Sequence, residues 1–303
     1  MTAKDGSSAG SIRRRDLLAA GLCLPLGLTA GASSQAAEVV PGNMKVSLAA
    51  YSMREALTSG EMDLFGFVDW CSEMDLSGAE LTSYYFKEGF DGAYLRRLKN
   101  HAFRQGVTVS GTAIRNDFCM PPGPEKDRQI AAVKNWIDYA AELGAPHVRI
   151  FAGNVPDGAD KAAAIRWTAE GIKAVLDHAG EKGVIVGLEN HGGITAMARD
   201  HLDICEQVGR HPWFGVNLDT GNYRNQPYEE LKLTAPWAVN VQVKVEVWKG
   251  EEKAPADLER IRDIISESGY KGWVVLEYEA SEEPLKAIPG YVRQLKRLFE
   301  SCA

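Results

Sequence analysis

Cysteine is scarce in this sequence, and so are the arrangements in which cysteine does chemistry. Five cysteines occur among 303 residues, at wide spacings and without a CxxC pair. Such spacing argues against both a zinc–thiolate site and a disulfide framework. We therefore expect most of these residues to be small, buried hydrophobic side chains.

Three other features are missing as well. The 34 Lys and Arg residues are outnumbered by 41 Asp and Glu residues and form no basic stripe, so nucleic acid is not expected as a partner. No GxGxxG follows the first expected strand, which disfavours a dinucleotide-binding fold. Beyond residue 36 no hydrophobic segment approaches the roughly 20 apolar residues that span a bilayer, so no membrane span is expected there.

The first 36 residues have the features of an export signal. The arginines of SIRRRDLL precede an apolar stretch, Leu17 to Thr29, that is followed by small residues. This order is typical of a twin-arginine signal peptide. We expect residues 1–36 to be the signal, 37–44 a linker and 45–303 a single catalytic domain that is periplasmic or otherwise exported. The signal itself carries a charge of +2, so the net charge of −7 becomes about −9 once it is removed.

Beyond the linker, short apolar runs alternate eight times with longer amphipathic segments. The expected strands are Val46–Tyr51, Gly78–Thr82, Val107–Ala113, His147–Phe151, Val184–Glu189, Phe214–Asp219, Val239–Val245 and Trp273–Tyr278. The expected helices are Met62–Met74, Ala93–Gln105, Asp127–Leu143, Ala159–Lys182, Thr195–Val208, Tyr228–Ala235, Pro255–Ser268 and Pro284–Ser301. Strict alternation favours an α/β fold with a parallel sheet. Eight units predict a (β/α)8 TIM barrel, with a doubly wound open sheet as the alternative.

Oxygen-bearing side chains stand at the ends of four consecutive expected strands. They are Glu189 in GLENHGG, Asp219 in NLDTGN, Gln242 in VQVKVE and Glu277 in VVLEYE. The C-terminal ends of barrel strands carry the chemistry of such folds. Carboxylates that converge there repel one another unless a cation lies between them, so the sequence predicts a divalent metal held by these four residues. Oxygen donors favour Mn²⁺ or Mg²⁺. The alternative stays open that the acids pair separately with Lys244, Arg149 or Arg54 as surface ion pairs.

The same motifs resemble the xylose isomerase-like barrels, a family of sugar phosphate isomerases and epimerases, and especially its branch of ketose 3-epimerases and inosose dehydratases. The resemblance runs from about Lys45 to Phe299. It implies that Glu189, Asp219 and Glu277 are the metal carboxylates, whereas Gln242 stands where the family usually has a metal-binding histidine. The nucleases of this fold need a histidine-rich cluster of three metals. Only His191 of the six histidines lies at these strand ends, which disfavours a nuclease.

The resemblance implies proton transfer next to a carbonyl. A metal that binds two oxygens of a hydroxy-ketone would stabilise the enediolate formed when the adjacent C–H loses its proton. One of Glu189 and Glu277 would take the proton and the other would return it on the opposite face, giving an isomerase or epimerase. Export favours an unphosphorylated sugar or sugar derivative as the substrate. The alternatives are a 3-keto-glycoside lyase or hydratase and a non-catalytic carbohydrate-binding barrel. The oligomeric state stays open, a homo-oligomer included.

Further residues are predicted to surround this site. His191 is expected to shuttle a proton or bind a hydroxyl group, and Lys244, which faces inward with Gln242 by strand alternation, to hold a substrate oxygen or neutralise the acids. The residues expected to contact the sugar are Arg54, Glu80, Asn222 and Trp248. For Tyr84, Tyr85 and Phe86 two fates stay open, stacking on a pyranose ring or packing beneath a helix.

Overall fold

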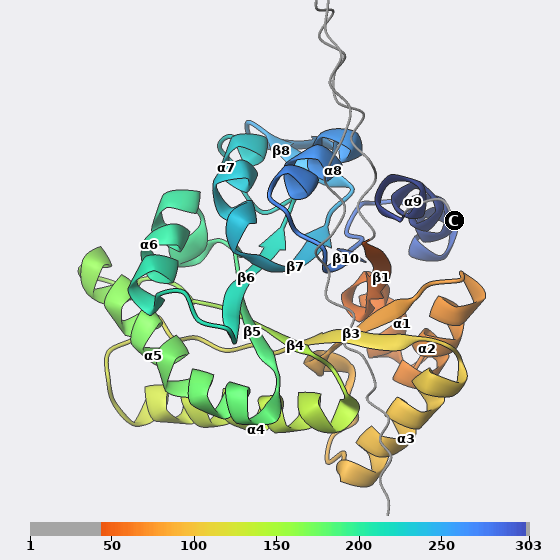
Figure 1. Ribbon diagram of the computed structural model, residues 1–303, viewed down its shortest axis with the longest axis horizontal. Helices are drawn as coiled ribbons and strands as arrows, with labels where there is room; N and C mark the ends of the chain where they lie inside the picture. Colours follow the sequence, from red (N-terminus) through yellow and green to blue (C-terminus); the bar gives the residue numbers. More distant parts are fainter. Residues whose placement is uncertain (1–43, 301–303) are drawn as a thin grey trace, which may run out of the picture. The chain divides into compact units, whose positions relative to one another are not determined.

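Eight parallel strands close into a barrel (Figure 1). In chain order they are β1 (Lys45–Ala49), β2 (Gly78–Thr82), β3 (Thr108–Ala113), β4 (His147–Ile150), β5 (Ile185–Glu189), β6 (Phe214–Asp219), β7 (Ala238–Val243) and β10 (Trp273–Leu276). The barrel closes where β10 pairs with β1, with Lys45 opposite Trp273. The predicted TIM barrel is therefore confirmed. The doubly wound alternative is wrong, because an open sheet would leave β1 without this partner.

The structure is a computed structural model that describes residues 44–300, all within the unit Val39–Ala303. The predicted signal peptide and residues 37–43 of the linker lie outside the described residues, as does Ser301 at the end of the last predicted helix. Among the described helices none is long and apolar enough to cross a membrane.

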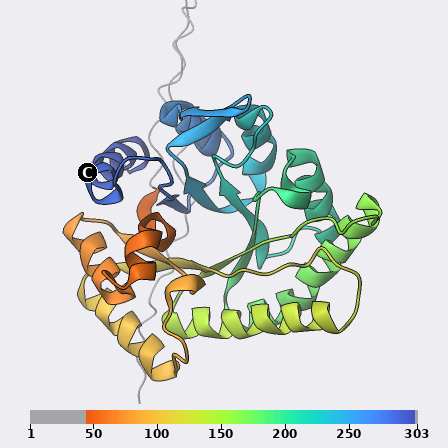
Figure 2. The same ribbon diagram turned by 180° about the vertical axis from the view of Figure 1, so that it is seen from behind.

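Helices follow the strands and cover the outside of the barrel, as the reverse view also shows (Figure 2). They are α2 (Leu64–Glu73), α3 (Gly92–Arg104), α4 (Pro124–Leu143), α5 (Lys161–Lys182), α6 (Ala198–Val208), α7 (Pro227–Thr234), α8 (Leu258–Glu267) and α9 (Pro284–Phe299). Several begin at an aspartate whose carboxylate accepts from the first turn, as Asp63 does from the Gly66 amide at 2.9 Å. The helices α4 and α5 end at Gly144 and Gly183 in the left-handed conformation that glycine adopts readily.

Short elements between the main ones account for most differences from the prediction. The predicted strand Val239–Val245 ends at Val243, because the chain then turns into an antiparallel hairpin of β8 (Glu246–Lys249) and β9 (Glu252–Pro255). The hairpin also delays the next helix, predicted from Pro255, to Leu258. A short helix, α1 (Arg54–Ser59), and the 3-10 turns η1 (Ala50–Met53) and η2 (Ser83–Tyr85) follow β1 and β2. These pieces are too short to show a hydrophobic period.

Candidate active site

Acidic and basic side chains meet at the C-terminal ends of β5, β6, β7 and β10. Glu189 and Asp219 are the last residues of β5 and β6, while Lys244 and Glu277 directly follow β7 and β10. A cavity of about 620 Å³, here called the mouth cavity, is lined by Glu189, Lys244 and Glu277 together with His191 and Glu279. This is the end of a TIM barrel at which catalysis takes place.

Lys244 lies among three carboxylates. Its Nζ is 2.5 Å from Oε2 of Glu277, 2.6 Å from Oε2 of Glu279 and 3.4 Å from Oδ2 of Asp219. Burial by itself would lower the pKa of Lys244, but these acids raise that pKa well above its ordinary value. The side chain is therefore an ammonium ion. Gly221 leaves room for it, since a Cβ on Gly221 would lie 2.6 Å from Cγ of Lys244.

Glu189 is paired with an arginine from the neighbouring strand. Nε of Arg149 in β4 lies 2.9 Å from Oε2 of Glu189, and Nδ2 of Asn222 donates to Oε1 at 3.1 Å. Only 3% of the Glu189 side chain is exposed. Burial and the neighbouring Asp219 and Glu277 raise the pKa of Glu189 in spite of Arg149. Glu189 can therefore carry a proton at a pH where an exposed glutamate would be ionised.

Glu277 is held in the opposite state. Burial would raise its pKa, but contact with Lys244, helped by Arg149, brings the pKa below its ordinary value. Glu189 and Glu277 thus line one cavity with pKa values displaced in opposite directions. Two acids in such different environments are suited to different steps of a proton transfer.

Asn190 fixes the relative position of β5 and β6. Its Nδ2 donates to the carbonyl of Asp219 at 2.8 Å, and its Oδ1 accepts from the Asp219 amide at 2.9 Å. The amide of Gly221 donates to Oδ1 of Asp219 at 2.8 Å. Burial is the main cause that raises the pKa of Asp219 to about 7. The asparagine of GLENHGG is thus a structural residue that aims a carboxylate at Lys244.

His191 faces the mouth cavity, as expected from its place after β5. Its ring lies 4.1 Å from that of Phe151, centroid to centroid. Although solvent reaches the side chain, partial burial by the cavity walls and the nearby Arg149 lower the pKa of His191 to about 4. The imidazole is therefore neutral at pH 7 and can donate or accept a hydrogen bond. The following glycines allow close approach, since a Cβ on Gly193 would lie 2.3 Å from the carbonyl oxygen of Gly153.

Gln242 and Glu80 take part in a polar network inside the barrel. The Gln242 amide donates from Nε2 to Oε1 of Glu80 at 2.7 Å and accepts at Oε1 from Asn217 at 2.6 Å. Asn240 donates to the other oxygen of Glu80 at 3.0 Å. On β6, Asn217 lies two residues before Asp219 and therefore deeper in the barrel. Because the Gln242 amide bonds to Asn217, it points into the barrel and away from the strand ends. Glu80 is fully buried, and neither residue lines the mouth cavity.

These contacts test whether the donor set fits the predicted Mn²⁺ or Mg²⁺. Lys244 already places a positive charge between Asp219 and Glu277, Glu189 faces Arg149, and both polar atoms of the Gln242 amide are engaged elsewhere. Within residues 44–300 no group of three or more His, Cys, Asp or Glu side chains could hold a metal ion. The arrangement of these side chains therefore does not fit a divalent cation. Metal binding by Glu189, Asp219, Gln242 and Glu277 stays a prediction that this geometry does not support.

The alternative prediction of surface ion pairs names two of the right partners, but the pairs are buried in the structure. Lys244 and Arg149 do pair with the strand-end acids, yet their side chains are only 8% and 5% exposed, so the pairs are buried and not on the surface. Arg54 pairs with none of these acids. Its Nη1 donates to the carbonyl of Tyr278 at 3.2 Å and its guanidinium faces the ring of Tyr51.

Other predicted sugar contacts lie in different places. Trp248 is on the β8–β9 hairpin, where the guanidinium of Arg224 lies 4.3 Å from the centroid of the Trp248 ring. Trp248 lines neither the mouth cavity nor the groove described next. Asn222 contacts Glu189 and so positions a catalytic candidate.

Two residues of the site are missed by the sequence prediction. Glu279 is not among the predicted site residues, although the alternation in LEYE places it on the same side of the strand as Glu277. For Arg149 the sequence predicts only a surface ion pair, although a charged residue within the short apolar strand HVRIF indicates a larger role.

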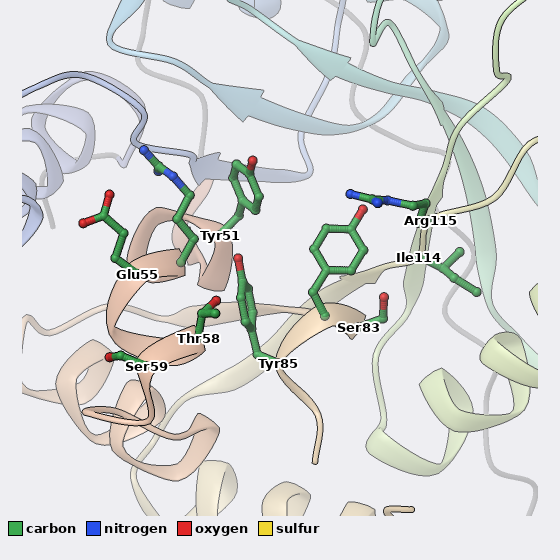
Figure 3. Close-up of a pocket in the computed structure, with 10 residues that line it drawn as sticks. Tyr51, Glu55, Thr58, Ser59, Ser83, Tyr85, Ile114 and Arg115 are labelled. Carbon is green, nitrogen blue, oxygen red and sulfur yellow. The ribbon is translucent and has the colours of Figure 1, made fainter. Parts of the chain in front are cut away.

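A second hollow adjoins the mouth cavity. It has a volume of about 840 Å³, and we call it the tyrosine groove. Its lining residues are Tyr51, Arg54, Glu55, Thr58, Ser59, Ser83, Tyr84, Tyr85, Ile114 and Arg115. Figure 3 shows Tyr85 rising toward Tyr51 and Arg115 extending from the loop after β3 toward the tyrosines. The sequence left open whether these aromatic residues face a sugar ring or pack inside the protein. Phe86 is buried in the core, whereas Tyr84 and Tyr85 line the groove.

A closed parallel barrel with acid–base side chains at its strand ends is the architecture of TIM-barrel enzymes. The family of xylose isomerase-like TIM barrels matches residues 68–300, and the chain belongs to that family. No protein of curated function matches the sequence.

Solved structures share this fold at low sequence identity. D-psicose 3-epimerase from Clostridium cellulolyticum H10, solved with D-tagatose, is 16% identical, with a TM-score of 0.69 over 86% of this chain and 100% of its own. The probable 3-DHS dehydratase AsbF of Bacillus anthracis is 16% identical, with a TM-score of 0.63 over 84% of this chain and 99% of its own. The protein SMc04130 from Sinorhizobium meliloti 1021 is 22% identical, with a TM-score of 0.67 over 84% of this chain and 98% of its own.

Proposed function

We propose that this protein is an enzyme that moves a proton next to the carbonyl group of an unphosphorylated sugar or sugar derivative, as an isomerase or epimerase. One observation carries the proposal: two carboxylates with oppositely displaced pKa values, Glu189 and Glu277, line the mouth cavity together with the ammonium group of Lys244. The sugar epimerases among the proteins of the same fold support a carbohydrate substrate.

The charges of the site suit enolisation. Lys244 donates a hydrogen bond to the carbonyl oxygen, and the ionised Glu277 accepts the proton from the adjacent carbon, which leaves the protonated Glu189 as the acid. The C–H bond breaks, its electron pair forms a carbon–carbon double bond, and the carbonyl electrons move onto the oxygen beside Lys244. A preorganised positive charge stabilises this developing oxyanion most strongly where water is excluded. For epimerisation, the second glutamate delivers a proton to the opposite face of the same carbon, and the carbonyl re-forms. For isomerisation, the proton goes to the former carbonyl carbon, while the neighbouring hydroxyl group passes its own proton to the oxyanion and becomes the new carbonyl.

Other residues hold these groups in place. Arg149 and Asn222 orient Glu189, and the neutral His191 is placed to bind a hydroxyl group of the sugar. No step requires a metal, because Lys244 supplies the positive charge at the carbonyl oxygen.

A 3-keto-glycoside lyase or hydratase is the second candidate, and the tyrosine groove favours it. In this reaction a carbon next to the ketone loses its proton and a carbon–carbon double bond forms. The bond to the glycosidic oxygen then breaks, and the departing alcohol takes up a proton. Such a substrate needs room for its leaving group beside the reacting ring, and the groove provides that room.

The proposal includes an exported location. It is supported by the arginines of SIRRRDLL and the apolar stretch behind them, with residues 1–36 as the signal, 37–44 as the linker and 45–303 as the catalytic domain. Fractionation of cells that produce the full chain, with Arg14 and Arg15 both changed to Lys as the control, tests it. Retention of the unchanged chain in the cytoplasm would contradict this part of the proposal.

Hydrogen exchange tests the chemistry directly. The protein is incubated in D₂O with ketoses and with 3-keto-glycosides, and deuterium uptake at the carbon next to the carbonyl is followed by NMR. We expect uptake with at least one substrate, and its loss in Glu277→Gln while the sugar still binds. Glu88→Gln, an exposed glutamate outside both hollows, is the matched control. Sugar binding without exchange in the unchanged protein would support the non-catalytic alternative and reject the enzyme.

A further inference from the structure

The mouth cavity and the tyrosine groove adjoin each other. Tyr51, Tyr84 and Arg115 line both hollows, so these three residues stand at the border between them. The two volumes, about 620 and about 840 Å³, each lie within the range of roughly 300–1,000 Å³ that is typical of small-molecule sites. A ligand ring held beside Lys244 therefore has space for a second ring at its side.

The walls of the groove suit a ring that is apolar on its faces and polar at its edges. The rings of Tyr84 and Tyr85 meet edge to face at 6.2 Å, and those of Tyr51 and Tyr84 at 6.5 Å. Each ring is only partly buried, which leaves area for a ligand. Burial raises the pKa of Tyr51 and Tyr85, so their hydroxyl groups stay protonated and can donate hydrogen bonds. Tyrosine thus offers both an apolar surface and a hydrogen-bonding tip.

The two arginines of the groove pack against its tyrosine rings. The guanidinium of Arg115 faces Tyr84 at 5.2 Å from the ring centroid. Arg54 faces Tyr51 at 5.5 Å and donates to the carbonyl of Tyr278. Glu55 adds a negative charge to the same wall. Glu55 offsets one of these two positive charges and the other lining residues are uncharged, so most of the wall suits a neutral sugar ring, to whose hydroxyl groups Arg115 can donate.

We propose that the tyrosine groove binds the second sugar ring of a neutral two-ring glycoside, while the reacting ring occupies the mouth cavity. The assignment of the reacting ring rests on the proposed function. Tyr85 and Thr58 line only the groove, whereas Tyr51 and Tyr84 stand at the border, where they can contact both rings. The preferred substrates are accordingly disaccharides or their keto derivatives, not free monosaccharides.

Binding measurements separate the two hollows. Dissociation constants are measured by calorimetric titration for glucose and for cellobiose, maltose and trehalose. We expect at least one disaccharide to bind about tenfold or more tightly than glucose, because its second ring gains the contacts with the tyrosines. Tyr85→Ala removes one wall and Thr58→Trp fills the groove from an exposed position on α1. Each should lower this preference by roughly tenfold.

Tyr139→Ala is the matched control, because Tyr139 is a half-exposed aromatic residue on α4 that lines neither hollow. Its preference for the disaccharide should equal that of the unchanged protein. The proposal is overturned if no disaccharide binds more tightly than glucose, or if Tyr85→Ala and Thr58→Trp weaken both ligands by the same factor. Disaccharide preference without deuterium exchange in any substrate would reject the proposed enzyme and leave the two-ring site standing.

Discussion

Nζ of Lys244 lies 2.5 Å from Oε2 of Glu277, in the position where the sequence predicts a divalent cation. The same ammonium is 3.4 Å from Asp219, so one positive charge already lies between two of the expected metal ligands. An ammonium ion can donate hydrogen bonds to a developing oxyanion, as a metal would stabilise it by coordination. The charge of Lys244 is therefore central to how this site is expected to work.

Replacing Lys244 tests that role. In Lys244→Gln we expect the rate of deuterium exchange to fall by about 10²–10³-fold, the usual effect of removing one group that stabilises an oxyanion. Lys244→Arg should retain part of the rate because it keeps the charge. Thermal unfolding of both variants shows whether the fold survives. An exchange rate unchanged in a folded Lys244→Gln would contradict the role of the ammonium.

Metal binding should appear only when the ammonium is removed. In the unchanged protein we expect neither chelator treatment nor Mn²⁺ to alter exchange or the midpoint of thermal unfolding. In Lys244→Ala the acids Asp219, Glu277 and Glu279 lose their common partner and become free to turn toward a cation, so Mn²⁺ should then raise the midpoint. Binding at a hundred times the dissociation constant stabilises by about 2.7 kcal/mol. Activity of the unchanged protein that is lost on chelation and restored by Mn²⁺ would show that the predicted metal site exists after all.

Acid should destabilise the protein through a buried histidine. His201 on α6 is fully buried, and burial lowers its pKa to about 4, whereas the unfolded chain binds this proton near pH 6.5. As pH falls from about 6.5 to about 4, only the unfolded state takes up the proton, so stability declines by at most about 1.4 kcal/mol per pH unit for this group. Urea unfolding at several pH values should show a shallower decline in His201→Phe. An unchanged slope would contradict this assignment.

The barrel interior should reject an added methyl group at Gly187. A Cβ there would lie 2.3 Å from Nε2 of His147 and 3.2 Å from Cβ of Asn217. Overpacking of this kind costs about 1–3 kcal/mol, so Gly187→Ala should lower the free energy of unfolding by that amount. Gly290 on α9 is the matched control, since a Cβ there meets nothing within 4 Å. Gly290→Ala should be neutral or stabilise the helix by about 0.5–1 kcal/mol. Equal effects of the two substitutions in chemical denaturation would refute this explanation.

The sequence by itself determined the barrel. The predicted strands Gly78–Thr82 and Phe214–Asp219 agree with β2 and β6 residue for residue. Strands buried on both faces are short apolar runs, and glycines such as Gly144 and Gly183 mark the helix ends. Both signals lie within a few neighbouring residues, so they can be recognised without knowing which strands pair. The strand-end acids Glu189, Asp219 and Glu277 were also found, because strand direction alone decides which end carries them.

Only the tertiary structure decided what those acids contact. Strand alternation predicts that Gln242 and Lys244 both face inward, but it cannot say that Gln242 bonds to Glu80, 162 residues away, while Lys244 reaches the acids. The partner of Glu189 is likewise Arg149, which comes from the neighbouring strand. Such contacts depend on the tilt and register of strands that meet only when the barrel closes. The sequence determined where the charged groups stand along the chain, and closure of the barrel decided that a lysine lies where a metal was expected.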